Sequence, residues 1–450
     1  MKKRYLFLWT LILAAVGLLY LSFFFFDSAC AQPFEPETFR EIRIPSRFSP
    51  VGSGARALGM GSAFIAVADD ATAASWNPGG LIQLDRPEIS VVGDYVYRTD
   101  DLDFGNNPEA NGSQNVSETK LNYLSVAYPF TLFNRNMIIS LNYQRRFDFD
   151  LDWEYTRNVS EPGLTGTDRI KNRQEGEIYA LGIAYSIKIL PKLSFGFTLN
   201  FWEDLLQDNK WEVKTVINES GVFKLDDGSQ EPFSGERIQD EEFKFSGFNF
   251  NLGILWHATG KLNVGVVFKS PFTADLEVQT TRSEESDFPQ ATSFRKENKD
   301  LDMPMSYGVG VAYRFSDQFL ISADFTRTHW DDFLLKNGDE ISPITTLPKN
   351  ESDIDPTNTI RVGGEYIFIK PKYIIPLRAG VFYDPAPARN SPDDFFGFSI
   401  GTGIGMNRFS LDAAYQYRFG RNVGESRPTE SDLSIDVDEH SFYSSLIIYF

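Results

Sequence analysis

The feature that most constrains this 450-residue chain is a series of fourteen strand-like runs whose connections alternate between long and very short. Apolar alternation bounded by turn residues predicts the runs at 89–97, 121–130, 137–150, 175–189, 193–207, 243–257, 262–278, 304–315, 318–330, 359–369, 373–384, 395–405, 408–420 and 439–450. Long, mostly acidic loops are expected at 99–119, 151–174, 208–242, 279–303, 331–358, 385–394 and 421–438. Tight turns are expected at 131–136, 190–192, 258–261, 316–317, 370–372 and 406–407. An even number of antiparallel strands, with long loops at one end and short turns at the other, is typical of bacterial outer-membrane barrels.

The predicted strands have two different faces. In 408–420, Phe409, Leu411 and Tyr415 share one face, whereas Ser410 and Asp412 share the other. Successive side chains of a strand point to opposite sides, so one face suits lipid and the other suits a wet or plugged lumen. In lipid every backbone N–H and C=O needs an internal partner, and only a closed sheet supplies it. The sequence therefore predicts an all-β fold, a 14-stranded antiparallel transmembrane β-barrel over residues 89–450.

The last predicted strand ends at the C-terminus itself. It carries Phe442, Leu446, Ile448 and Phe450 at alternate positions. This pattern resembles the signal by which barrel-assembly machinery takes up outer-membrane proteins. We therefore expect that machinery to be a partner of this chain.

The first 31 residues have the features of an export signal. A basic stretch at 2–4 precedes an apolar run at 5–26, and small residues flank Cys30 at a cleavage site. We predict a signal peptide at 1–31, with two alternatives open: the apolar run is long enough for an anchor helix, and Cys30 is a candidate for lipidation. Cys30 is the only cysteine, so cleavage leaves no disulfide, catalytic thiol or cysteine metal site.

The chain is acidic, with a formal net charge of −19. A surface of this charge repels phosphate backbones, which disfavours nucleic acid as a partner. Acidic loops are either a solvated rim or a place where divalent cations bind beside lipopolysaccharide. Outer-membrane lipid and lipopolysaccharide are therefore the expected surroundings.

Residues 32–88 do not have the pattern of a barrel strand, and we predict an N-terminal extension and a lumen hatch there. Small residues dominate 51–64, and they allow close backbone approach in a confined space. Asp69 or Asp70 is a suitable N-cap for a short helix over 71–75. Pro78 with the glycines after it is expected to end that helix.

A known family has a similar segment. Residues 54–81 run from Gly-Ala-Arg-Ala-Leu-Gly-Met-Gly through Asp69 and Asp70 to Asn77 and Pro78. This stretch resembles the N-terminal hatch of FadL/TodX-type outer-membrane transporters. Residues 85–90 and 265–272 also look like family segments. One departure is Gly79, where the family motif has alanine after Asn-Pro.

The resemblance implies a fourteen-stranded barrel that takes up hydrophobic compounds, such as long-chain fatty acids, passively past the hatch. Gate residues are then expected at Asp69, Asp70, Asn77, Pro78 and Gly79. The Asn-Pro-Gly stretch is either a hinge, with the Asn77 amide bonded to the barrel wall, or a plain helix stop.

A second class of function stays open. The chain is alternatively a binding or assembly platform, or a secretion shuttle. Its long loops, above all 208–242 and 331–358, would then bind a surface protein.

Enzyme chemistry is not expected. Gly397–Gly401 fits G-x-S-x-G, but the match lies inside an alternating strand and not at a strand–turn–helix junction. His257, His329 and His440 are far apart in the sequence and have no metal-ligand spacing. We expect no cofactor and no metal, and a monomeric protein.

Overall fold

A computed structural model describes most of the chain. The described residues are 53–105, 107–225, 228–286, 291–338, 340–343, 354–388, 391–423 and 433–450. The predicted signal peptide and the predicted extension up to residue 52 lie outside the described residues.

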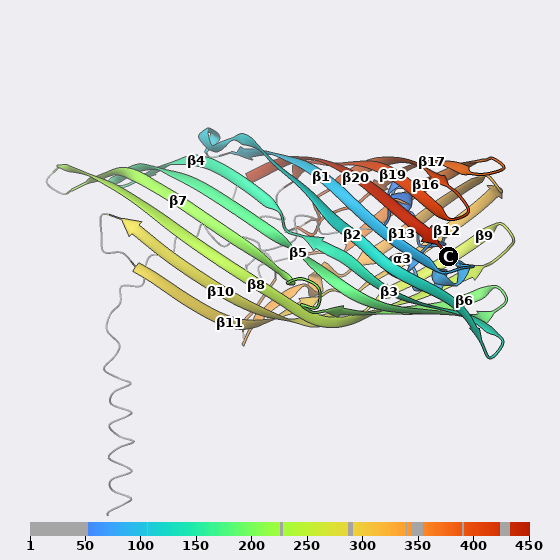
Figure 1. The fold of residues 1–450 in the computed structure, drawn as a ribbon. Coiled ribbons are helices and arrows are strands. Elements are labelled where there is room, and N and C mark those ends of the chain that lie inside the picture. The colour runs from blue at the N-terminus through green and yellow to red at the C-terminus, as the bar shows by residue number, and fades with distance from the viewer. Residues whose placement is uncertain are drawn as a thin grey trace, which may run out of the picture. The chain divides into compact units, whose positions relative to one another are not determined.

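The sheet closes on itself, as predicted. Strand β1 (Glu88–Phe104) pairs with β2 (Gly112–Leu132) on one side and with β20 (Leu433–Tyr449) on the other. All neighbours around the barrel are antiparallel, as Figure 1 shows, and several wall strands are built from two consecutive elements. The other strands are β3 (Arg135–Asp148), β4 (Leu151–Glu161), β5 (Leu164–Leu190), β6 (Leu193–Trp202), β7 (Lys210–Lys224), β8 (Gln230–His257), β9 (Leu262–Lys269), β10 (Phe272–Ser286), β11 (Ala291–Met303), β12 (Ser306–Ser316), β13 (Phe319–Thr328), β14 (Leu334–Asn337), β15 (Glu340–Pro343), β16 (Thr357–Ile369), β17 (Ile374–Tyr383), β18 (Phe395–Gly405) and β19 (Phe409–Val423).

Wall strands are counted by joining β3 to β4, β6 to β7, β9 to β10, β11 to β12, β13 to β14 and β15 to β16. The result is the predicted fourteen. The tight turns also lie where they were expected. Between β2 and β3, for example, Phe133 and Asn134 have φ of 51° and 59°, a backbone conformation typical of a two-residue hairpin turn.

The prediction of long loops was largely wrong. Residues 208–242 were expected to be a loop, but β7 and the first part of β8 form a paired hairpin there. Paired strands likewise occupy most of 99–119, 151–174, 279–303 and 421–438 among the described residues. Outside the lipid a strand needs no apolar face, so apolar alternation does not detect it. Figure 1 shows β4, β5, β7, β8, β10 and β11 projecting at the end opposite the C-terminus.

The two faces of the wall differ as the alternation predicted. Along β17 every second residue is exposed, with Leu377 and Val381 facing outward, while Arg378 and Phe382 are buried. On β8, Phe248, Ile254 and Trp256 are exposed on the outward face. Such apolar and aromatic residues suit contact with lipid.

Residues 53–87, here called the inner segment, contain short helices. These are α2 (Ala55–Gly59), α3 (Ala73–Trp76) and the 3-10 turn η2 (Pro78–Gln83); two further 3-10 turns, η3 (Pro108–Ala110) and η4 (Trp330–Asp332), lie between strands. None of the helices in the described part of the chain is long and apolar enough to span a membrane.

The predicted helix over 71–75 needs correction. It begins at Ala73, because the Asp70 carboxylate accepts hydrogen bonds from Thr72 N and Thr72 Oγ1 and so forms a turn first. It does end before Pro78, but that proline opens η2 instead of starting a loop.

Candidate functional site

The inner segment lies against the lumen side of the wall. Side chains of eight strands, β1, β2, β5, β6, β9, β13, β18 and β20, hydrogen-bond its backbone. On β13, one carboxylate oxygen of Asp324 accepts from the N–H groups of Phe64 and Ile65, at 2.6 and 2.8 Å. The other bonding side chains are Glu88, Tyr123, Ser125, Ser186, Ser194, Thr198, Asn263, Ser399 and Ser445.

Glycines line the wall where the inner segment comes closest. A Cβ atom added at Gly363 would lie 2.0 Å from Met60 O, and one at Gly380 would lie 2.3 Å from Gly61 N. Both distances are shorter than any van der Waals contact, so larger residues there would push the inner segment away. The same close approach occurs at Gly196, Gly253 and Gly265.

Buried ion pairs tie the inner segment to β16, β17 and β19. We call this set the ion-pair ladder: Asp69, Arg56, Glu365, Arg378 and Asp412. Arg56 Nη1 lies 2.5 Å from Asp69 Oδ1, and Arg56 Nη2 lies 2.9 Å from Glu365 Oε1. Arg378 then bridges Glu365 and Asp412, at 2.6 Å each. Burial lowers the pKa of Arg56, but the carboxylates outweigh it and hold that pKa above its usual value.

The two predicted gate aspartates have different surroundings. Asp69 is part of the ladder, whereas Asp70 mainly holds the turn at Thr72. Burial raises the pKa of the Asp70 carboxyl, against the opposing effect of Arg56, whose Nη1 is 3.9 Å away. A gating role for either aspartate stays a prediction.

Asn77, Pro78 and Gly79 form the tightest contact with β8. The Asn77 amide donates to Ile65 O at 2.8 Å and to Ile254 O of the wall at 3.0 Å, and its oxygen accepts from Gly79 N. The side chain thus makes the kind of wall bond expected for a closed hatch. Gly79 is also confined, since a Cβ there would lie 2.8 Å from Gly253 O. Whether this stretch acts as a hinge stays a prediction.

The residues of the expected assembly signal share the outward face of the barrel. Phe442, Leu446 and Ile448 are exposed on β20, and Phe450 follows the strand. Their recognition by assembly machinery stays a prediction.

Between the inner segment and the long hairpins, apolar side chains fill the lumen. We call this group the outer apolar cluster. It includes a stack in which Trp211 lies between Phe149 and Phe243, with ring centroids 4.3 and 4.8 Å away. Other members are Leu102, Phe147, Trp153, Trp202, Phe245, Leu276, Phe395 and Ile435.

A polar belt separates this cluster from the inner segment. Along the lumen face of β6, Ser194 and Thr198 bond the inner segment, Asn200 follows, and Trp202 belongs to the cluster. Most cations in the belt have carboxylate partners. The pairs include Arg98 with Asp100, Arg145 with Asp94 and Arg361 with Asp384.

One sector of the belt lacks such pairing. We call it the cationic sector: Arg146, Asn200, Asn251 and Lys269. Among the described residues, neither Arg146 nor Lys269 has an ion-pair partner, although Arg146 is buried. Both amide atoms of Asn200 and of Asn251 are also without a hydrogen-bond partner in that part of the chain.

The members of the cationic sector are close together. Asn251 and Lys269 are direct cross-strand partners on β8 and β9. Asn200 is diagonal to Asn251, because the strand partner of Asn251 is Thr198. Arg146 lies within electrostatic range of Lys269 and repels its ammonium. The sector therefore offers two basic side chains and two amides to an acceptor-bearing group.

Carboxylates also cluster beside β3, but around an ammonium group. Oxygens of Glu118, Asp148 and Asp150 lie within 4.8 Å of one another. Lys120 Nζ is 2.5 Å from Glu118 and 2.7 Å from Asp150. The group is therefore a set of salt bridges.

The histidines and the serine motif are far from one another. His257 bonds Asn263, and His440 bonds Tyr415. His329 lies near Asp331 and Asp332 at the turn η4. Ser399 of the G-x-S-x-G match accepts a hydrogen bond from Gly61 N at 2.8 Å, so it holds the inner segment.

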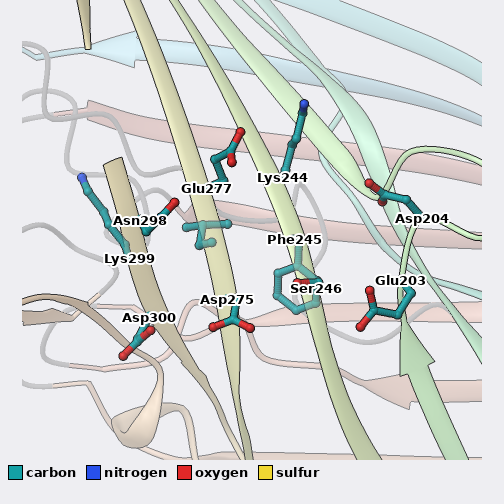
Figure 2. Close-up of a pocket in the computed structure, with 11 residues that line it drawn as sticks. Glu203, Asp204, Lys244, Phe245, Ser246, Asp275, Glu277, Asn298, Lys299 and Asp300 are labelled. Atoms are coloured by element: carbon teal, nitrogen blue, oxygen red, sulfur yellow. The ribbon is translucent and has the colours of Figure 1, made fainter. Parts of the chain in front are cut away.

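On the outer surface, a hollow of about 390 Å³ lies beside β8 and β10. Figure 2 shows Glu203 and Asp204 on one side of it, and Asp275 and Asp300 on the other. Phe245 and Leu276 of the outer apolar cluster also line this hollow.

Sequence reasoning missed the cationic sector. Asn251 was on the polar face of its strand and Lys269 was in a family-like segment, but neither had a predicted role. Arg146 lies at a register shift between Arg145 and Phe147, and its lack of a carboxylate partner depends on distant strands, which the sequence pattern does not show. An unmatched cation on a lumen-facing position is the signal that would have revealed it.

Comparison with known proteins gives a consistent result. A family model described as outer membrane protein transport protein (OMPP1/FadL/TodX) matches residues 48–446. The long-chain fatty acid transport protein of Salmonella typhi is 23% identical over 408 residues, covering 84% of this chain and 87% of that protein.

Two solved structures are similar in fold. A FadL homologue of Pseudomonas aeruginosa has a TM-score of 0.60 at 16% identity, covering 90% of this chain and 100% of that chain. The toluene transporter TodX of P. putida has a TM-score of 0.58 at 16% identity, covering 89% of this chain and 99% of that chain.

Proposed function

Because this chain belongs to the OMPP1/FadL/TodX family of outer-membrane transport proteins, we propose that it takes up hydrophobic compounds with an anionic head group. Long-chain fatty acids are the compounds of this kind that fit best. The family consists of transport proteins of the bacterial outer membrane that carry hydrophobic compounds and are not enzymes. The proposal adds the head group, the passive mechanism and the gate.

The observation that carries the proposal is the cationic sector. Removing a charge from water without a partner costs several kcal/mol even after relaxation. Arg146 and Lys269 have no carboxylate partner among the described residues, in a lumen where most other cations do. A carboxylate bound there would offset that cost. A neutral hydrocarbon would not.

The outer apolar cluster supplies the surface for the tail. Its aromatic and aliphatic side chains line the lumen immediately above Asn200 and Arg146. An alkyl chain gains roughly 0.8 kcal/mol for each CH₂ group that it buries. A fatty acid bound with its tail in the outer apolar cluster and its carboxylate in the cationic sector would match the order in which these two regions follow one another along the lumen.

The relatives support this choice of substrate only in part. The Salmonella typhi protein is named a long-chain fatty acid transport protein. TodX is named a toluene transporter, but its likeness to this chain is one of fold. The unpaired cations favour the acid over the hydrocarbon.

The inner segment acts as the gate in this proposal. It contacts the wall on many sides through hydrogen bonds, close glycines and the ion-pair ladder. A solute that reaches the cationic sector cannot pass until the inner segment shifts, which is a gating step and needs no energy source. Assembly by barrel machinery, contact with lipopolysaccharide and a monomeric state are parts of the same proposal.

The head-group proposal is tested by exchanging Lys269 for Met. In proteoliposomes we expect Lys269→Met to lower binding and uptake of oleate, while uptake of toluene stays as in the wild type. Lys296→Met, which removes an exposed lysine on β11, is the matched control for the change in net charge. Equal losses for oleate and toluene, or no loss for either, would contradict the proposal.

The gate is tested by deleting residues 51–81. The barrel should still insert and show heat-modifiable mobility, but solute flux should change. Unchanged uptake in both this deletion and a full knockout would show that the chain does not transport these solutes. Trimming the β7–β8 hairpin separates transport from the platform alternative: loss of a surface partner with intact uptake would favour the platform.

A further inference from the structure

The outer loop, residues 203–208, joins β6 to β7 and lies on the outside of the barrel wall. Its position follows from Tyr179 on β5. That residue has the same outward parity as Ile183, which is exposed, yet Tyr179 itself is fully buried. Its hydroxyl bonds the outer loop, at 3.0 Å to Glu203 O and 2.6 Å to Gln207 O. The outer loop therefore covers Tyr179 from the outside.

The outer loop is held in a defined conformation. Backbone N–H groups of Leu206 and Gln207 donate to the Tyr179 hydroxyl at 3.1 and 3.0 Å. Asn209 closes the loop, because its amide bonds both backbone groups of Tyr179 and its N–H donates to Asp204. A loop fixed at both ends and in the middle presents its exposed side chains in one direction.

Two of these side chains are leucines. Leu205 and Leu206 are 67% and 66% exposed, among the most exposed apolar residues described. Burying apolar side chains away from water is favourable, and in water these two leucines gain nothing from it. The side of the outer loop nearest β8 is polar instead, where Glu203 and Asp204 line the hollow in Figure 2.

The outer loop begins at the edge of the lipid-facing surface. Phe201 precedes it by two residues and packs against the exposed Phe248 on β8, with ring centroids 5.2 Å apart. The next outward residues on β8 are Ser246 and Lys244, which are polar. The leucine pair is thus continuous with the apolar surface and lies at its boundary.

We propose that the outer loop is a membrane anchor whose Leu205 and Leu206 insert among the acyl chains of the outer leaflet. We assign lipid as the binding partner because the two leucines adjoin the lipid-facing surface of the wall. In outer-membrane barrels the long hairpins are extracellular. The outer loop lies toward the end of the barrel that carries these hairpins, so the leaflet it meets is the outer one.

The anchor has a consequence for the wall. Gln207 donates to Tyr143 Oη at 3.3 Å and to Glu177 at 2.6 Å. Tyr143 lies on β3 and stacks on Tyr179, with ring centroids 5.1 Å apart. Lipid that holds the outer loop therefore also holds β3 just before its register shift at Arg146.

Spin-label accessibility tests the proposal directly. Leu205→Cys and Leu206→Cys are introduced one at a time into a cysteine-free background, Cys30→Ser. Each variant is labelled with a nitroxide and placed in phosphatidylcholine vesicles. Oxygen concentrates in lipid and a nickel chelate in water, so the ratio of the two accessibilities reports depth. Phe248→Cys is the lipid control, and Lys214→Cys, on the exposed face of β7, is the water control.

We expect labels at both leucines to have an oxygen-to-nickel ratio near that of the Phe248 label and well above that of the Lys214 label. A ratio like that of the Lys214 label would place the outer loop in water and overturn the proposal. Low accessibility to both reagents would also overturn it, because the leucines would then be packed against protein. Since the two leucine side chains are mostly exposed, the variants should fold, and none of the outcomes depends on transport.

Discussion

Arg56 and Arg146 both lie inside the same barrel, Arg56 partly and Arg146 fully buried, but their surroundings differ. Arg56 lies in the ion-pair ladder, between Asp69 and Glu365. Arg146 lies in the cationic sector, where no carboxylate pairs with it among the described residues. A paired buried charge fixes a structure, whereas an unpaired one carries a cost that a ligand of opposite charge removes. The comparison separates the part of the lumen that holds the inner segment from the part that is ready to bind.

Replacing Arg56 by Met should have the largest effect. Asp69 loses its cation, whereas Glu365 keeps Arg378. Because Arg56 and Asp69 are partly exposed, the cost should lie below the roughly 3–5 kcal/mol of a fully buried pair. We expect the inner segment to loosen and leak conductance in planar bilayers to rise, while the barrel keeps its heat-modifiable mobility. Arg169→Met, which breaks an exposed pair with Glu154, should leave conductance unchanged. Wild-type conductance in Arg56→Met would mean that the ladder does not hold the inner segment.

Arg146→Met should affect binding and not stability. Hydrogen bonds to charged groups contribute about 1.5–3 kcal/mol, so affinity for oleate should fall roughly 10- to 100-fold. The free energy of unfolding should stay the same or rise, since an unpaired charge is removed. Arg98→Met is the contrast, because it deprives Asp100 of its partner and should destabilise. A similar destabilisation in both variants would remove the distinction between paired and unpaired cations.

Asn77→Ala should have a smaller effect than Arg56→Met. It removes two donated hydrogen bonds, one of them to the wall at Ile254, and leaves carbonyl groups unsatisfied at a cost of about 1–3 kcal/mol. Insertion and heat-modifiable mobility should persist, while leak conductance or oleate uptake changes. Gln83→Ala is the matched control, because its amide bonds only the inner segment. Wild-type behaviour in both assays would reduce Asn77 to a turn residue.

Ser399→Ala should have the smallest effect. It removes one hydrogen bond from Gly61 N, worth about 1 kcal/mol. Thermal unfolding should shift slightly, and oleate uptake should stay close to wild type. Ester hydrolysis assays should give the same background for both proteins. A hydrolytic activity lost in this variant would contradict the assignment of Ser399 to a structural contact.

The sequence predicted the kind of fold better than it predicted the lengths of the strands. Strand β17 was found nearly to its ends, because its lipid-facing positions are apolar and its lumen positions are not. Strand β8 was predicted to begin at 243 but begins at Gln230. Its first residues lie beyond the lipid, where polar side chains are allowed on both faces, so the hydrophobic pattern contains no information about them.

The candidate site was less predictable than the fold. The wall bond of Asn77 was anticipated in one of two alternatives, a hinge or a plain helix stop, because its amide can both donate and accept. Arg146 was not expected, because its role depends on which distant strands supply carboxylates. Ion-pair partners are set by the closed barrel, and a single strand does not reveal them.

The pairing of β1 with β20 also sets an order of events in biogenesis. These are the first and last strands among the described residues, and they pair along their whole length, from Glu88 with Tyr449 to Phe104 with Leu433. Until β20 has been synthesised and exported, β1 presents an open edge that is prone to wrong pairing. The inner segment must also be inside before this seam closes, since Ala55 N bonds Ser445 of β20. We therefore expect closure of the barrel between β1 and β20 to be the final step of folding, with the inner segment already inside the lumen.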